Sequence, residues 1–142
     1  MLSMQRVLII DDYPDHLKIY GWILEQAGFD AVLCLARRTG VELPQDDGIR
    51  LVILDYALHC NLTPVQVAEA IRAAYPGAPI VLLSDVGGLP QDIAPYVDEF
   101  VRKGEPQKLI ALVTRLLAVP QLRPSPATGT PIARACAEPV RG

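Results

Sequence analysis

Several features that define whole classes of protein are absent from this sequence. Its three cysteines, Cys34, Cys60 and Cys136, are an odd number without Cys-x-x-Cys spacing, so neither a disulfide framework nor a zinc site is predicted. No apolar run approaches the roughly 20 residues that span a bilayer, and the first residues lead into an apolar strand instead of a secretory signal. We therefore expect a cytoplasmic protein without a membrane partner.

The patterns that nucleic-acid binding requires are also missing. Aromatic residues make up 6% of the chain, the net charge is −3, and residues 1–119 contain no basic stripe with interleaved aromatic side chains. The 142 residues are 51% hydrophobic, which is enough for one domain with a packed core. We assign residues 1–119 to that domain. Residues 120–142 are rich in proline and alanine without apolar periodicity, and we expect them to form a disordered tail.

Short apolar segments of the chain end in side chains that carry chemistry. The apolar segments 7–10, 51–54 and 80–83 lead into Asp11-Asp12, Asp55 and Ser84 respectively, and a fourth candidate strand, 99–102, leads into Lys103. Apolar strands that alternate with helical segments are typical of a doubly wound α/β fold with a parallel sheet. Because the carboxyl ends of parallel strands line one edge of the sheet, we expect these side chains to meet in one pocket.

Helix signals separate the strands. Pro14 favours the start of a first helix that Gly28 ends, a capping box occurs at 63–66, and Glu105-Pro106 begins the last helix. The stretch 36–50 leaves room for only a short helix. Between Ser84 and Lys103, glycines and prolines require any helix to be short or distorted.

The predicted pocket favours a bound cation and a phosphoryl group. The carboxylates of Asp11, Asp12 and Asp55 would repel one another unless a cation neutralised them. Mg2+ prefers oxygen ligands and is usually held by one or two carboxylates together with phosphate oxygens. Asp55, alone at the end of its strand, is the best candidate for the nucleophile. Lys103 and Ser84 are suited to neutralise and to hydrogen-bond phosphoryl oxygens.

In this combination the residues resemble the receiver domains of two-component response regulators, over roughly residues 5–118. The resemblance rests on Asp11-Asp12, on Asp55 after Leu-Val-Ile-Leu, on Ser84 after Ile-Val-Leu-Leu, and on Lys103. It implies a flavodoxin-like sheet of five parallel strands in the order 2-1-3-4-5, with helices on both faces. It further implies a CheY-like, single-domain phosphoprotein that accepts a phosphoryl group on Asp55 from a histidine kinase or a phosphotransfer protein, with Mg2+ as cofactor.

The resemblance also implies roles for particular residues. The metal ligands would be Asp12, Asp55 and the backbone carbonyl of Ala57, with Asp11 acting largely through water. Ser84 would be the switch hydroxyl, and Phe100 the aromatic residue whose rotation accompanies its movement. The chain would signal by binding a downstream protein, and its own catalysis would be limited to self-phosphorylation and self-dephosphorylation. We expect no DNA-binding domain and leave a weak homodimer open.

Several features depart from the family pattern, two of them beside the site residues. Gly104 follows Lys103 where the family commonly has a proline joined by a cis bond, and without proline a cis peptide costs about 2.5–4 kcal/mol. Asp85 follows Ser84 where a small residue is usual. A carboxylate at the rim of a phosphate pocket repels the phosphodonor, so we expect Asp85 to weaken phosphorylation or the active state.

The residues two positions after Asp55 and after Ser84 affect hydrolysis of the phosphoryl group. They are Ala57 and Val86, and both are apolar. Neither has a group that could orient a hydrolytic water. We therefore expect slow autodephosphorylation.

Other functions fit parts of the pattern. A pseudo-receiver would keep the site residues and bind partners without phosphorylation, with Asp85 and Gly104 biasing it to one state. A Mg2+-dependent phosphohydrolase resembling haloacid dehalogenases needs a second carboxylate two residues after the nucleophile, and no such residue follows Asp11 or Asp55. A nucleotide-binding protein is disfavoured because no glycine-rich turn follows the first strand.

The two histidines, His16 and His59, also have metal-binding chemistry. Neither has a second ligand at a metal-site spacing in the sequence. We therefore expect both to be exposed.

Overall fold

Five parallel strands form the centre of the protein, in a computed structural model that describes residues 4–85 and 87–118. The strands are β1 (Arg6–Asp11), β2 (Asp30–Leu35), β3 (Ile49–Asp55), β4 (Ile80–Ser84) and β5 (Glu99–Arg102). The helices are α1 (Pro14–Gln26), α2 (Pro64–Ala74), α3 (Pro106–Ala118) and the short 3-10 helix η1 (Ala94–Tyr96). The tail expected at 120–142 lies outside the described residues.

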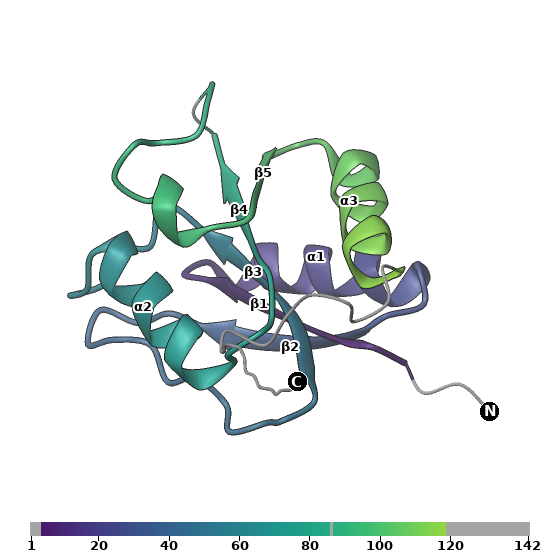
Figure 1. The fold of residues 1–142 in the computed structure, drawn as a ribbon, viewed down its shortest axis with the longest axis horizontal. Coiled ribbons are helices and arrows are strands. Elements are labelled where there is room, and N and C mark those ends of the chain that lie inside the picture. Colours follow the sequence, from purple (N-terminus) through teal and green to yellow (C-terminus); the bar gives the residue numbers. More distant parts are fainter. Residues whose placement is uncertain (1–3, 86, 119–142) are drawn as a thin grey trace, which may run out of the picture.

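The strand order is β2-β1-β3-β4-β5, with every neighbouring pair parallel, which confirms the predicted order. Helices α1 and α3 cover one face of the sheet, and α2 covers the other (Figure 1). The predicted doubly wound, flavodoxin-like α/β fold is therefore confirmed. In this topology the order of the strands reverses between β1 and β3, and ligands bind in the crevice at that point.

The central strands are buried on both faces. Leu8, Leu54 and Leu82 pack under α2, whereas Ile9 and Ile53 pack under α1 and α3, and none of these five side chains is more than 1% exposed. Strands covered on both sides need apolar residues at every position, which explains the continuous apolar runs in the sequence. This packing fixes the ends of β1, β3 and β4, where the candidate site lies.

The helices begin and end where the local signals indicate. At the start of α2, the Gln66 backbone N–H donates to the Thr63 hydroxyl at 3.1 Å, and the Thr63 N–H donates to the Gln66 side chain at 2.9 Å. This capping box satisfies two backbone donors that the helix leaves unpaired. Helix α1 ends before Gly28, whose φ of 97° suits glycine. No helix within 4–85 or 87–118 has the length and apolarity needed to cross a membrane.

The connection from β2 to β3 contains no helix, although all of residues 36–48 are described. A tight turn closed by backbone pairing between Arg37 and Gly40 leads into an extended segment, and Val41 packs against the core under α2. Gly40 has a φ of 140°, and Pro44 follows soon after. Both residues disfavour a helix. The short helix that the sequence allowed in this stretch is therefore not formed.

The connection from β4 to β5 contains only the short helix η1, as its glycines and prolines indicate. Its end is anchored by Asp98, whose Oδ2 accepts a hydrogen bond from the Ile80 backbone N–H at 2.8 Å. The same oxygen accepts a second bond from the Arg72 guanidinium of α2 at 2.9 Å. One carboxylate therefore joins the start of β4, helix α2 and the entry to β5.

We expect Asp98→Ala to lower the free energy of unfolding by about 1.5–3 kcal/mol, because both of its charge-assisted hydrogen bonds are lost. Chemical denaturation of the full chain measures this. Asp92→Ala is the matched control, since Asp92 lies in the same connection and only accepts an exposed hydrogen bond from Tyr56. Asp92→Ala should change the free energy of unfolding by less than about 0.5 kcal/mol. Equal effects of the two variants would contradict the anchoring role of Asp98.

Candidate functional site

Three carboxylates meet at the carboxyl edge of the sheet. Asp11 ends β1, Asp12 follows it, and Asp55 ends β3. One ligand oxygen from each of the three lies within 4.8 Å of the others. Asp11 and Asp55 are 1% and 2% exposed, so two of the three charges are removed from water. The structure therefore brings together the three acidic residues that the strand ends predict.

Asp11 occupies the least favourable position for a negative charge. Its Oδ1 accepts a hydrogen bond from the Tyr13 backbone N–H at 3.0 Å, whereas its buried Oδ2 has no hydrogen-bond partner among the described residues. Burial, together with the nearby charge of Asp55, raises the pKa of Asp11 from 3.8 to about 6. An unsatisfied buried carboxylate oxygen is the kind of atom that a cation satisfies.

Asp12 lies at the outer side of the cluster, where it has hydrogen-bond donors. Its Oδ2 is 2.5 Å from the His59 Nδ1 and 3.3 Å from the His59 backbone nitrogen, which donates to it. Partial burial favours a raised pKa at Asp12, but the bonds from His59 outweigh it and lower the pKa of this carboxyl. Asp12 therefore carries its charge more readily than Asp11 does.

Lys103 compensates the charge of Asp55. Its Nζ lies 2.9 Å from the Oδ1 of Asp55, and its side chain is 14% exposed. Burial disfavours the ammonium, yet the hydrogen bond and the charge of Asp55 raise the pKa of Lys103 above its ordinary value. The backbone N–H of Lys103 donates to the Ser84 carbonyl at 3.0 Å, which ties the end of β5 to the end of β4. The lysine is thus held at the carboxylate by the sheet.

Ser84 and Phe100 share one face of the sheet. Ser84 is 3% exposed at the end of β4. Phe100 pairs in register with Leu82, two residues before Ser84, so the three side chains point to the same face. Phe100 is half-buried and packs against the core under α2. The arrangement puts the predicted hydroxyl and aromatic residue on neighbouring strands.

The positions that depart from the family pattern lie around Lys103. No peptide bond of the described residues is cis, and Gly104 turns the chain with a φ of 87°. Asp85 is exposed, and its charge adds to those that raise the pKa of Lys103. The backbone N–H of Ala57 donates to the Asp55 Oδ1 at 3.3 Å, and Ala57 itself is exposed. Val86 lies outside the described residues.

Both histidines lie at the acidic pair, which the sequence did not indicate. His59 is exposed as predicted, at 86% of its side chain, but it contacts Asp12. The prediction for His16 was wrong, because this residue is half-buried and its Nδ1 lies 3.5 Å from the Oδ2 of Asp11. Residue spacing could not reveal either contact, since His16 reaches Asp11 across the strand-to-helix turn and His59 comes from a different connection.

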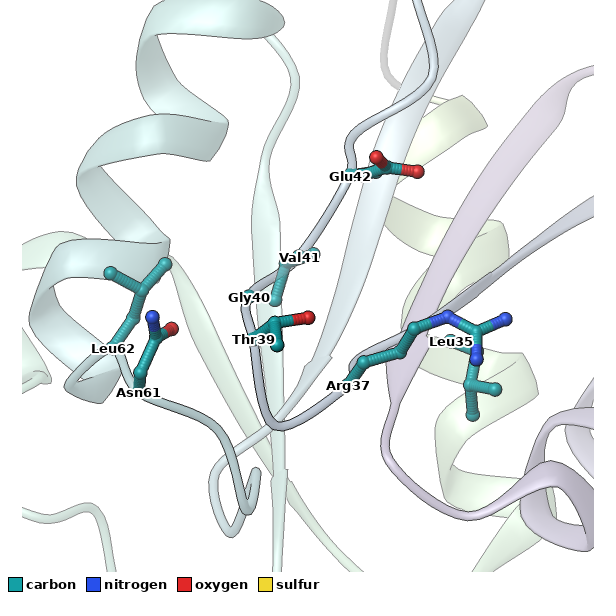
Figure 2. Close-up of a pocket in the computed structure, with 8 residues that line it drawn as sticks. All are labelled: Leu35, Arg37, Thr39, Gly40, Val41, Glu42, Asn61 and Leu62. Carbon is teal, nitrogen blue, oxygen red and sulfur yellow. The ribbon is translucent and has the colours of Figure 1, made fainter.

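A pocket of about 460 Å3 adjoins the carboxyl end of β2. Figure 2 shows Asn61 and Leu62 on one side of it, Arg37 and Leu35 on the other, and the Thr39-Gly40 turn between them. The backbone N–H of Asn61 donates to the Arg38 carbonyl at 2.9 Å, which joins the two loops. The pocket exists because the connection 36–48 is a loop, and the sequence did not predict it.

Comparison with solved structures identifies the fold as that of response regulator receiver domains. The CheY-like receiver domain protein of Methanospirillum hungatei JF-1 has a TM-score of 0.67 at 18% identity, over 82% of this chain and 95% of that one. A receiver domain protein from Clostridium thermocellum has a TM-score of 0.66 at 18% identity, over 81% and 95% of the two chains. The BeF3-activated DrrB receiver domain has a TM-score of 0.65 at 20% identity, over 82% and 100%.

Sequence comparison leads to the same class of protein. The transcriptional regulatory protein GlrR of Escherichia coli strain K12 and QseF of Escherichia coli O157:H7 are each 27% identical over 88 residues, or 62% of this chain. The matched region spans only 20% of the length of each relative. No protein-family model matches the chain. The relatives and the solved structures together confirm the resemblance to response regulator receiver domains that the motif residues indicate.

We expect Asp11→Asn to raise the free energy of unfolding of the metal-free protein by about 1–3 kcal/mol at pH 7.5, because it removes a buried charge whose pKa is raised from 3.8 to about 6. A raised pKa means that the wild-type protein loses stability as the pH rises from about 4 through 6. The difference between variant and wild type should therefore shrink below pH 6. Denaturation at several pH values measures the difference in the free energy of unfolding between the variant and wild type. A variant less stable than wild type at pH 7.5 would contradict the prediction.

Proposed function

We propose that this protein is a cytoplasmic receiver that accepts a phosphoryl group on Asp55 in a Mg2+-dependent reaction and signals by binding another protein. The observation that carries the proposal is the 2.9 Å contact between the Lys103 ammonium and the buried Asp55 carboxylate, inside a cluster of three carboxylates. An ammonium and a cation site on the same carboxylate are what an attack on a phosphoryl group requires, because the negative charges of both reactants must be screened.

The oxygen atoms at this edge fit a hard dication. The proposed ligands are Asp12, Asp55 and the Ala57 backbone carbonyl, with Asp11 acting through water. All of these donors are oxygens, which Mg2+ prefers. The Oδ2 of Asp11, which has no hydrogen-bond partner among the described residues, adds a site for a water or an ion. When bound, Mg2+ neutralises charge on the acidic cluster and on the phosphoryl oxygens.

Each side chain then has a defined part in the transfer. An oxygen of Asp55 attacks phosphorus, the bond from phosphorus to the donor breaks, and an acyl phosphate forms on Asp55. Lys103 exchanges its contact with the carboxylate for one with a phosphoryl oxygen. The Ser84 hydroxyl donates to another phosphoryl oxygen, and Phe100 on the neighbouring strand follows that movement. The domain itself acts on no other substrate, so its catalysis ends with its own phosphorylation and dephosphorylation.

The proposed phosphoryl donor is the phosphohistidine of a histidine kinase or a phosphotransfer protein. The proposed readout is a downstream protein that binds the phosphorylated form. GlrR and QseF are described as transcriptional regulatory proteins, but the match spans about a fifth of their length, so their output function is not transferred to this chain. The proposal therefore covers the receiver at 1–119.

Incubation of the full chain with acetyl phosphate or phosphoramidate and Mg2+ should add the mass of one phosphoryl group, and intact-mass spectrometry measures this. Asp55→Asn should show no adduct under the same conditions. Asp11→Asn is a useful second variant, since it keeps the acceptor and removes a member of the cluster, and it should slow the reaction without abolishing the site of attachment.

A wild-type protein that gains no phosphoryl group from either donor would contradict this function and favour the pseudo-receiver. Asp85→Ala would then show whether the exposed carboxylate next to Ser84 is the cause. If this variant gains the adduct and wild type does not, repulsion of the donor by Asp85 blocks an otherwise complete site.

Hydrolysis of the acyl phosphate should be slow, with label persisting for minutes or longer after donor removal. The reason is that Ala57, exposed beside the acceptor, presents only a methyl group and cannot orient a water. Ala57→Asn should shorten the lifetime several-fold by supplying a polar group at that position. Loss of label from wild type within seconds would contradict the prediction.

A further inference from the structure

Strand β2 forms one edge of the sheet (Figure 1), and among residues 4–85 and 87–118 it pairs with β1 alone. The backbone N–H of Asp30 donates to the carbonyl of Gln5, so the even-numbered residues of β2 bond toward β1. Peptide groups alternate in direction along a strand. The odd-numbered residues Ala31, Leu33 and Leu35 therefore present their N–H and C=O groups to the outer edge.

The sequence of β2 lacks the features that protect edge strands. Such strands are usually kept from pairing by lysine, proline, a bulge or very short length. After Asp30, β2 reads Ala-Val-Leu-Cys-Leu, and Leu33 is 46% exposed. The opposite edge strand, β5, has only four residues, begins with Glu99 and ends with Arg102. The edge of β2 is thus suited to pairing with another strand, whereas that of β5 is not.

Helix α1 lies directly against this edge. Gly21 faces β2, and a Cβ atom added to it would come 3.0 Å from the Cδ2 of Leu33 and 3.8 Å from the Cβ of Ala31. A larger residue would push α1 away from the strand. The glycine therefore lets one flank of the helix reach the outer margin of the sheet.

That flank presents an exposed aromatic side chain between opposite charges. Burial raises the pKa of Tyr20, and a hydrogen bond with the Gly104 backbone after β5 opposes this rise, so Tyr20 lies on the flank turned toward β5. At about 3.6 residues per turn, the side chains of Lys18, Trp22 and Glu25 point to the other flank, along the outer edge of β2. Trp22 is 63% exposed, and Lys18 and Glu25 are exposed as well.

We propose that a second copy of this chain occupies this edge, through antiparallel pairing of the two β2 strands about a two-fold axis at Leu33. The outward N–H and C=O groups of Leu33 then bond to those of the second copy's Leu33, and Ala31 pairs with the second copy's Leu35. A two-fold axis uses the same surface on both copies, so one unprotected edge satisfies the other.

The charges on α1 favour a second copy over an unrelated protein. Because Gly21 lies beside Leu33, Lys18 and Glu25 lie about one turn to either side of the axis. The two α1 helices run antiparallel on the same face of the joined sheet, which brings each Lys18 toward the second copy's Glu25. Trp22 lies near the axis, where the two indole rings meet and lose their exposed surface to each other. The flank is therefore complementary to itself.

The proposed dimer leaves both acceptor sites open. The two five-stranded halves run antiparallel, so their carboxyl edges point in opposite directions and the two Asp55 residues lie at opposite ends of the joined sheet. Dimerisation through β2 goes beyond the phosphoacceptor function and does not depend on it.

Light scattering of the full chain after size exclusion, without any phosphoryl donor and from micromolar to millimolar concentration, tests the proposal. At the high end the mass should be twice the 15.5 kDa of the chain. Trp22→Lys should weaken dimerisation about 30-fold or more, because it places two charges at the axis. Ile19→Lys is the matched control, since Ile19 is an exposed apolar residue on the outer side of α1, and it should change dimerisation less than about twofold.

Charge reversal tests the orientation of the two copies. Lys18→Glu and Glu25→Lys should each weaken dimerisation about 3- to 30-fold, because like charges then face each other across both symmetric contacts. The double variant restores opposite charges and should dimerise as wild type does. Lys18 and Glu25 are about 10 Å apart along the helix and do not pair within one copy, so this rescue reports a contact between copies.

Hydrogen exchange locates the contact on β2. The amides of Ala31, Leu33 and Leu35 should be protected in the dimer and lose this protection on dilution. A chain that is monomeric at every concentration would overturn the proposal. Protection of the three amides in such a monomer would do so too, because another part of the same chain then covers the edge.

A dimer that Trp22→Lys leaves unchanged, or that the double charge variant does not restore, would also overturn the proposal, since the contact then lies elsewhere. Circular dichroism of each variant shows that it is folded. Because no phosphoryl donor is present, failure of these experiments leaves the acceptor role of Asp55 unaffected.

Discussion

Repulsion among three carboxylates held within 4.8 Å of one another is the constraint on which the other features of the site depend. Each carboxylate is balanced differently. Lys103 neutralises Asp55, and the N–H groups of His59 stabilise the charge of Asp12. Asp11 has a pKa of about 6, and its Oδ2 has no hydrogen-bond partner among the described residues. The poorly compensated charge at Asp11 favours a nearby cation, because a cation gains most where negative charge is least compensated.

The sheet maintains this unfavourable arrangement. Burial of β1, β3 and β4 on both faces contributes far more than the local repulsion costs, at about 25 cal/mol for each Å2 of apolar surface removed from water. The backbone hydrogen bonds between the strands then fix where the strands end. The hydrogen bond from the Lys103 backbone N–H to the Ser84 carbonyl fixes where the Lys103 ammonium enters the site. Most of the stability comes from the apolar interior, whereas the chemistry comes from the polar residues at the edge.

Most of the fold follows from local sequence signals. Doubly covered strands require apolar runs such as 51–54, and helix starts are determined by residues within one turn, as Thr63 and Gln66 show. The grouping of Asp11, Asp12 and Asp55 was predictable because parallel strands share one carboxyl edge. The sequence did not resolve the loop 36–48 or its pocket, since the breakers Gly40 and Pro44 exclude a helix without defining what replaces it.

The histidine contacts could not be predicted for a different reason. His16 reaches Asp11 through the exact path of the turn after β1, and the orientation of its ring depends on Tyr13. His59 reaches Asp12 from a connection 47 residues away. Neither contact has a fixed spacing that a motif would record. Both depend on side-chain packing at the sheet edge, which only the three-dimensional structure provides.

The central claim is that Asp55, and neither member of the acidic pair, forms the bond to phosphorus. Borohydride reduction of the protein after incubation with acetyl phosphate and Mg2+ converts an aspartyl phosphate to homoserine, and peptide mass mapping locates that residue. The account predicts homoserine at position 55 alone, because Asp55 is the carboxylate in contact with Lys103. Homoserine at position 11 or 12, or at none of the three positions, would contradict it.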